Sequence, residues 1–115
     1  MGYYDDEVEI VLCAASAYEQ LYYLNEEFES LPTQVKEELQ IMCVLYTEEV
    51  GGVLAVVFNE DGELELRPEH TEEDILYDQI GSILKIKELQ QVKQELFEQL
   101  EMYYKVYQSL GEFEP

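Results

Sequence analysis

The side chains that most often carry catalysis are scarce in this sequence. It has one histidine, His70, in a Pro-Glu-His-Thr segment, and two cysteines, Cys13 and Cys43, in apolar runs. Burial and neighbouring carboxylates raise the pKa of a thiol, so neither cysteine is a promising nucleophile. No serine lies in a nucleophile elbow, and no glycine-rich loop joins a strand to a helix. We therefore expect that the protein is not an enzyme, with His70 in a loop and both thiols buried.

Metal and cofactor sites are also poorly supported. The segment Asn-Glu-Asp-Gly-Glu, residues 59–63, resembles part of a calcium loop. It lacks the ligands at alternate positions and the terminal bidentate glutamate that such a loop needs. Zinc would need more cysteine and histidine than the chain has. We expect no metal and no cofactor, and we interpret residues 59–63 as a turn.

Carboxylates are the most abundant chemistry in the chain. Residues 72–82, EEDILYDQIGS, form either the start of a helix or a carboxylate-rich site. Thr71 and Asp74 have the spacing of a relaxed capping box, and the acids of a first turn lie at the positive end of the helix dipole. The spacing therefore predicts a helix from Thr71 and gives residues 72–74 a structural role. Asp78 is left without one.

The charge of the chain restricts its partners. Twenty-seven acidic residues face six basic ones, a net charge of −21. Residues 1–84 hold 21 acids and two bases, a net charge of −19, whereas residues 85–115 are nearly neutral. This disfavours nucleic acid and anionic membranes, since both are polyanions, and it favours a basic protein as partner. No apolar run is long enough to span a membrane and no basic leader follows Met1, so we expect a cytoplasmic protein.

The length of 115 residues suits one domain, with frayed ends at residues 1–7 and 111–115. A helical stripe predicts a first helix over residues 14–29, while residues 8–13 fit either a strand or a helix. A second helix runs from Pro32 to the Gly51-Gly52 stop. VLAVVF, the turn residues Asp61-Gly62 and ELELRP predict a β-hairpin, whose first strand is central or covered on both faces. A third strand would come from residues 8–13 or from a second subunit.

A long C-terminal helix completes the expected α+β fold. It runs from Thr71 to about Leu110, and its helix-breaking Gly81 marks the expected bend. From Ile86 onward its apolar residues follow a heptad, which either joins two subunits or packs against the helix at residues 32–50. The candidate self-association seam is Leu89, Leu96, Leu100, Tyr103 and Tyr107.

Tyrosines and acids in the first part of the chain suggest a docking face. Tyrosine is enriched in interface hot spots, and YEQLYYLNEEFE would present its rings among carboxylates to a basic protein. The candidate partner surface consists of Tyr18, Tyr22, Tyr23, Glu26, Glu27 and Asp78.

Three blocks of the chain are familiar: YEQLYYLNEEF, LPTQVKEELQIMCVLYTEEVGG and DILYDQIGSILKIKELQ. Together they resemble a family of small, acidic, uncharacterised proteins of clostridial Firmicutes, over residues 11–107. The resemblance implies a bacterial cytosolic protein and transfers no catalytic or binding residue.

Two functions are compatible with these features. The first is a non-enzymatic protein–protein interaction module that self-associates as a homodimer. The alternative is an acidic DNA mimic, a decoy with carboxylates at phosphate-like spacing for a basic nucleic-acid-binding protein. The sequence does not identify the partner protein.

Overall fold

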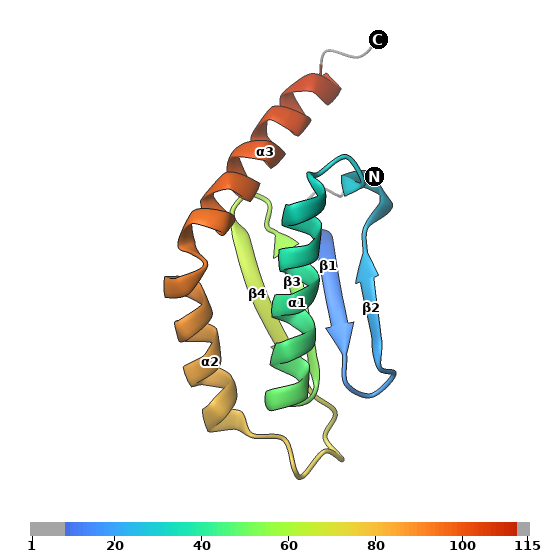
Figure 1. Cartoon of the computed structure of the whole chain (residues 1–115), viewed down its shortest axis with the longest axis vertical. Helices are drawn as coiled ribbons and strands as arrows, with labels where there is room; N and C mark the ends of the chain where they lie inside the picture. The colour runs from blue at the N-terminus through green and yellow to red at the C-terminus, as the bar shows by residue number, and fades with distance from the viewer. Residues whose placement is uncertain (1–8, 113–115) are drawn as a thin grey trace.

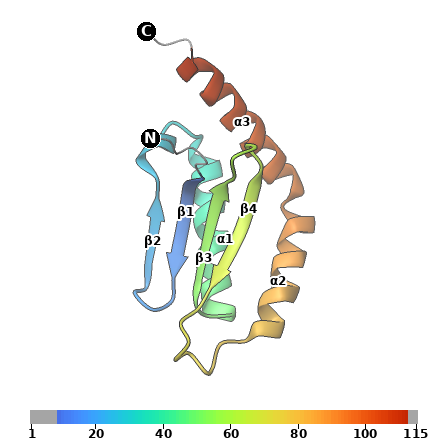
Figure 2. The same ribbon diagram turned by 180° about the vertical axis from the view of Figure 1, so that it is seen from behind.

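A computed structural model describes residues 9–112 and shows an α+β fold whose helices lie on one side of a sheet (Figure 1). The sheet is antiparallel, with strand order β2-β1-β3-β4. Helix α1 lies across one face, and α2 and α3 run beside β4; no helix covers the other face in Figure 2. The elements are β1 (Ile10–Ser16), β2 (Leu21–Leu24), η2 (Glu26–Phe28), α1 (Thr33–Glu49), β3 (Val53–Phe58), β4 (Leu64–Glu69), α2 (Gln79–Val92) and α3 (Gln94–Glu112).

The predicted helix over residues 14–29 is wrong. This part of the chain contains the end of β1, a turn, β2 and the short 3-10 helix η2. Gln20 turns the chain with a φ of 54°, and Asn25 ends β2 by accepting from the Glu27 N–H and donating to the Val11 carbonyl. Pairing of β1 with both β2 and β3 satisfies its backbone groups, which outweighs the apparent helical spacing. Residues 8–13 fitted either a strand or a helix, and from Ile10 onward they form a strand.

The second helix and the hairpin are confirmed. Helix α1 begins after Pro32 and ends before Gly51 and Gly52, both of which have positive φ. Strands β3 and β4 pair in register around a turn in which the Asn59 side chain accepts from two backbone N–H groups. Strand β3 is central in the sheet, as one of the two expected arrangements requires.

The C-terminal helix differs from the prediction at its start and at its break. It begins at Gln79, not at Thr71, because the Asp78 side chain caps it by accepting from the Gly81 N–H at 2.8 Å. Gly81 therefore lies in the first turn, where a side chain would collide with the Asp78 carboxylate, and it is not a bend. The break lies at Lys93, between α2 and α3. There the Lys93 ammonium contacts Glu38 Oε2 at 2.9 Å, which ties the break to α1.

The core lies between α1 and the sheet and extends under α3. Leu39, Met42, Cys43 and Tyr46 of α1 are buried together with inward-facing residues of β1 and β3. A second part is aromatic: the buried Phe28 ring contacts rings from β3 and α3, namely Phe58, Tyr103, Tyr104 and Tyr107. The aromatic part of the core thus joins η2 to β3 and to α3. The predicted frayed ends fall mostly outside the described residues; within them, residues 111–112 complete α3.

Candidate functional site

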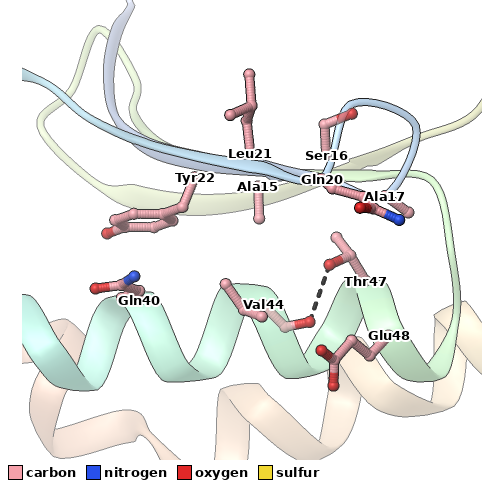
Figure 3. Close-up of a pocket in the computed structure, with 10 residues that line it drawn as sticks. All are labelled: Ala15, Ser16, Ala17, Gln20, Leu21, Tyr22, Gln40, Val44, Thr47 and Glu48. Carbon is pink, nitrogen blue, oxygen red and sulfur yellow. Dashed lines mark hydrogen bonds between the residues drawn. The ribbon is translucent and has the colours of Figure 1, made fainter.

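The residues predicted to form one partner surface lie in several places. Tyr22 points from β2 toward α1 (Figure 3), whereas its neighbour Tyr23 is exposed. Glu26 and Glu27 lie in η2, where Glu27 accepts from the Tyr107 hydroxyl at 3.2 Å. These four residues share no single face. Tyr18 and Asp78 both belong to the region of the segment between β4 and α2, because Tyr18 bonds to Asp74 within it and Asp78 lies at its end.

Tyr18 connects the β1–β2 turn to this segment. Its hydroxyl donates to Asp74 Oδ2 at 2.6 Å and accepts from the Thr71 N–H at 3.1 Å. At the other end of the segment Asp78 caps α2. The carboxylates of Asp74 and Asp78 are thus each held by a hydrogen bond. Asp78, whose role the sequence left open, therefore has a structural role as the cap of α2, and it also positions a negative charge there.

An exposed apolar surface begins at the same segment. Ile75 and Leu76 are 88% and 89% exposed, and Ile80 at the start of α2 is 73% exposed. Isolated exposed apolar side chains are ordinary, whereas large exposed apolar patches mark interaction surfaces. We call this group the loop patch: Ile75, Leu76, Ile80, Ile83 and Leu84.

A hollow of about 560 Å³ adjoins the loop patch. Ile75 and Ile80 form its apolar part, and Asp74 and Asp78 line it with carboxylates. The rings of His70 and Tyr77 also line it and stack with centroids 4.3 Å apart. The Tyr77 hydroxyl lies 3.1 Å from that of the buried Tyr46, so this wall is anchored to the core.

The electrostatics of this region are strongly negative. Residues 69–78 include five acids and no lysine or arginine. The neighbouring cation Lys85 is already paired, with Glu49 at 3.2 Å and Glu88 at 3.4 Å. These pairs raise the pKa of Lys85, chiefly through Glu49, which keeps it protonated. The hollow therefore combines apolar walls with two carboxylates, and no lysine or arginine is among the described residues that line it.

A second hollow, of about 580 Å³, lies between the β1–β2 hairpin and α1 (Figure 3). Ala15 and Tyr22 point into it from the sheet, and Leu21 and Ser16 point away. Gln20, Gln40 and Glu48 give it a polar lining, and the Thr47 hydroxyl is used within α1, where it donates to the Val44 carbonyl. The Ser16 hydroxyl, which points away from the hollow, accepts from the Glu19 N–H at 3.2 Å.

The predicted self-association seam faces the interior of the chain. Leu89, Leu96 and Leu100 are buried, and Leu96 and Leu100 line a small cavity together with Val35 of α1. The Tyr103 hydroxyl lies 2.6 Å from Ser30 Oγ, and the Tyr107 ring lies against Phe28. The exposed apolar stripe of α3 is a different one, formed by Met102, Val106 and Leu110.

The candidate residues for catalysis and metal binding lie in different environments within residues 9–112. His70 lies in the exposed segment after β4, whereas Cys13 of β1 and Cys43 of α1 are buried in the core. Residues 59–63 form the hairpin turn, and within residues 9–112 no group of three or more His, Cys, Asp or Glu could hold a metal ion. None of the helices in this range is long and apolar enough to cross a membrane.

The loop patch was missed because its residues resemble a buried stripe. Leu76, Ile80, Ile83 and Leu84 have helical spacing, which predicts a packed face. In the structure Leu76 precedes α2 and Ile80 lies in its first turn, and both side chains are largely exposed. The surrounding run of acids was the signal that could have identified an exposed apolar group.

These features define a small α+β domain with an antiparallel sheet, helices on one face and an acidic, apolar surface at one end. The chain belongs to a family of unknown function (DUF6145), whose model matches residues 9–112. This agrees with the expectation of an uncharacterised family, while its clostridial origin stays a prediction. No similarity to a curated protein or to a solved structure was found.

Proposed function

We propose that the protein is a non-enzymatic interaction module whose loop patch docks a basic, amphipathic segment of a partner protein. The observation that supports this best is the near-complete exposure of Ile75 and Leu76 beside the carboxylates of Asp74 and Asp78. An apolar surface alone would fit many partners. The added negative charge selects one that presents lysine or arginine next to apolar residues.

The hollow beside the loop patch suits a long basic side chain. The alkyl stem of a lysine or arginine would lie against Ile75 and Ile80, and its charged end would reach Asp74 or Asp78. Both carboxylates are already oriented, by Tyr18 and by the Gly81 N–H, so little ordering is needed on binding. The partner's apolar side chains would cover Leu76 and the exposed face of α2.

This proposal is tested by selecting peptides from a random library displayed on phage. We expect wild-type protein to enrich peptides with basic and apolar residues at helical spacing, and the Ile75→Ser/Leu76→Ser variant to bind them at least about 10-fold more weakly. Asp78→Asn should weaken binding while keeping the helix cap, because asparagine caps as well as aspartate. Ile41→Ser/Leu45→Ser removes exposed apolar residues from α1 and serves as the matched control. Equal binding by the two double variants would contradict the proposal.

The DNA-mimic alternative has less support. A mimic needs carboxylates in rows on one surface, but the acids here are spread over η2, α1, β4 and the segment before α2, and several are paired. On β4, Arg67 binds Glu9 at 2.8 Å and Glu65 at 2.9 Å. The bond from Arg67 lowers the pKa of Glu9, and the pKa of Glu65 is lowered first by Asn59 and then by Arg67. On α1, Glu38 and Glu49 pair with Lys93 and Lys85.

Self-association is a second candidate function, and the stripe of Met102, Val106 and Leu110 supports it. These exposed residues recur every fourth position, so they share one face of α3. Residues 85–115 are nearly neutral, so two copies can approach there without the repulsion expected between their first parts. In Figure 1, α3 continues past the end of the sheet, which leaves this face accessible.

Self-association is tested through the mass of the protein in solution, which should differ between wild type and a variant of the α3 stripe. We expect sedimentation equilibrium at high micromolar concentration to give a dimer for wild type and a monomer for Val106→Glu, because a charge in an apolar contact is costly to bury. Ile41→Glu on α1 introduces the same charge elsewhere and should leave the dimer intact. A wild-type monomer throughout the concentration range would overturn this second function without affecting the loop patch.

A further inference from the structure

The two cysteines lie together in the core although they are far apart in the sequence. Cys13 Sγ of β1 and Cys43 Sγ of α1 are 3.9 Å apart, both are free, and both side chains are fully buried. We infer that Cys13 and Cys43 form a redox-active pair, which hydrogen peroxide converts to a reversible disulfide between β1 and α1.

The surroundings give the two sulfur atoms different roles. The hydrogen bond from Cys43 lowers the pKa of Cys13, the nearby Tyr22 hydroxyl also lowers it, and burial opposes both. The pKa of Cys43 is raised, first by the same hydrogen bond and then by burial. Cys13 is therefore the thiol that ionises first and attacks, and Cys43 is the thiol that resolves. Burial would leave a single thiol inert, but here a second sulfur is within contact distance.

The reaction needs peroxide as its only oxidant. The Cys13 thiolate attacks one oxygen of hydrogen peroxide, the O–O bond breaks, and Cys13 becomes a sulfenic acid while hydroxide leaves and is protonated to water. The Cys43 sulfur then attacks the Cys13 sulfur, so that an S–S bond forms, the S–O bond breaks and a second water leaves. Two thiols are oxidised, and one peroxide is reduced to two waters. A thiol reductant reverses the change by exchange.

Tyr22 places this pair beside the hollow under the β1–β2 hairpin. Its ring lines that hollow, and its hydroxyl oxygen is buried without a hydrogen-bond partner among the described residues. Burial raises the pKa of Tyr22, and the neighbouring thiols raise it further. The disulfide would join β1 to α1 and hold the two walls of the hollow together.

The test is peptide mapping of the folded protein after peroxide treatment. Remaining thiols are blocked with N-ethylmaleimide on denaturation, and digests are compared with and without dithiothreitol. We expect a cross-linked pair of peptides containing Cys13 and Cys43, two hydrogens lighter than the reduced peptides together and lost on reduction. Exposed Met102 is an internal standard, because its conversion to sulfoxide shows how much oxidant the folded protein has received.

Two variants distinguish the roles of the sulfurs. Cys43→Ala should stop at a sulfenic acid on Cys13 that dimedone traps, whereas Cys13→Ala should leave Cys43 available to N-ethylmaleimide. The inference is overturned if both wild-type thiols stay free after Met102 is fully oxidised, if the cross-link forms only in urea, or if it joins two chains. None of these outcomes depends on partner binding, so they test the thiol pair separately from the proposed function.

Discussion

Replacing Phe28 with alanine should destabilise the fold by about 3–5 kcal/mol, the typical cost of removing a buried aromatic ring. Phe28 is fully buried, and its ring lies 5.7 Å from Phe58 of β3 and 6.2 Å from Tyr104 of α3 between centroids. The same ring contacts Tyr107, so it holds η2, the sheet and α3 in one cluster. A domain of this size has a total stability of about 5–15 kcal/mol, so the loss would be a large part of it.

The measurement is urea denaturation followed by circular dichroism. Phe28→Leu fills much of the cavity and should lose clearly less than Phe28→Ala. Tyr23→Ala removes a ring of similar size from an exposed position on β2 and should change the free energy of unfolding by about 1 kcal/mol or less. Equal losses for Phe28→Ala and Tyr23→Ala would show that the aromatic cluster does not stabilise the fold.

The Gly52→Ala substitution is expected to cost about 2–4 kcal/mol through backbone strain and overpacking. Gly52 has a φ of 71°, and a Cβ there would collide with the Glu69 carbonyl oxygen and lie 2.8 Å from Tyr77 Cε1. Its own carbonyl accepts from the Ala17 N–H at 2.8 Å, so the residue cannot move without breaking that contact. Gly52 thus joins the β1–β2 turn, the end of β4 and the wall of the acidic hollow.

Gly62→Ala is the matched control for Gly52→Ala. Gly62 also has a positive φ, 81°, but the nearest atoms to a new Cβ are side-chain atoms of Gln108 and Tyr104 at 3.8 Å. It should therefore lose only the conformational part, about 1 kcal/mol. Thermal denaturation of both variants separates the cost of the positive φ, which the two positions share, from the cost of the steric collision at Gly52. Similar losses at the two positions would mean that the crowding at Gly52 is relieved at little cost.

The parts of the fold that the sequence predicted well are those with local signals. Pro32 and the Gly51-Gly52 pair mark the two ends of α1, and Asp61-Gly62 marks the hairpin turn, so both elements follow from neighbouring residues. Asn59 strengthens the turn through side-chain contacts that its residue type makes available. Local chemistry therefore predicts half of the sheet and the helix that covers it.

The β1–β2 hairpin was not predictable in the same way. Its turn ends at Gln20, which takes a positive φ without being glycine or asparagine, so the usual turn signal is absent. Strand β1 also has an irregular register between Val11 and Cys13, which breaks the alternation expected of a strand. The remaining apolar spacing resembles a helix, and only pairing with β3 identifies it as sheet.

The candidate site was predicted in part, through Asp78 and Tyr18. Tyr18 reaches this region through its hydrogen bond to Asp74, a residue separated from it by most of the sheet in the sequence. No glycine or proline marks the break at Lys93, and the residue that pairs with Lys93 is Glu38 of α1. Such long-range contacts are decided by tertiary packing, so single-sequence patterns do not contain them.

The strand order of the sheet has a consequence for how the chain is synthesised. The two hairpins are local, but the central pair, β1 with β3, forms only after β2, η2 and α1 have been made. Closing so long a segment is slow compared with hairpin formation. On the ribosome, β1 therefore waits with one edge unpaired until β3 emerges, and the first half of the chain is the part most exposed to chaperones and to misassembly with other nascent chains.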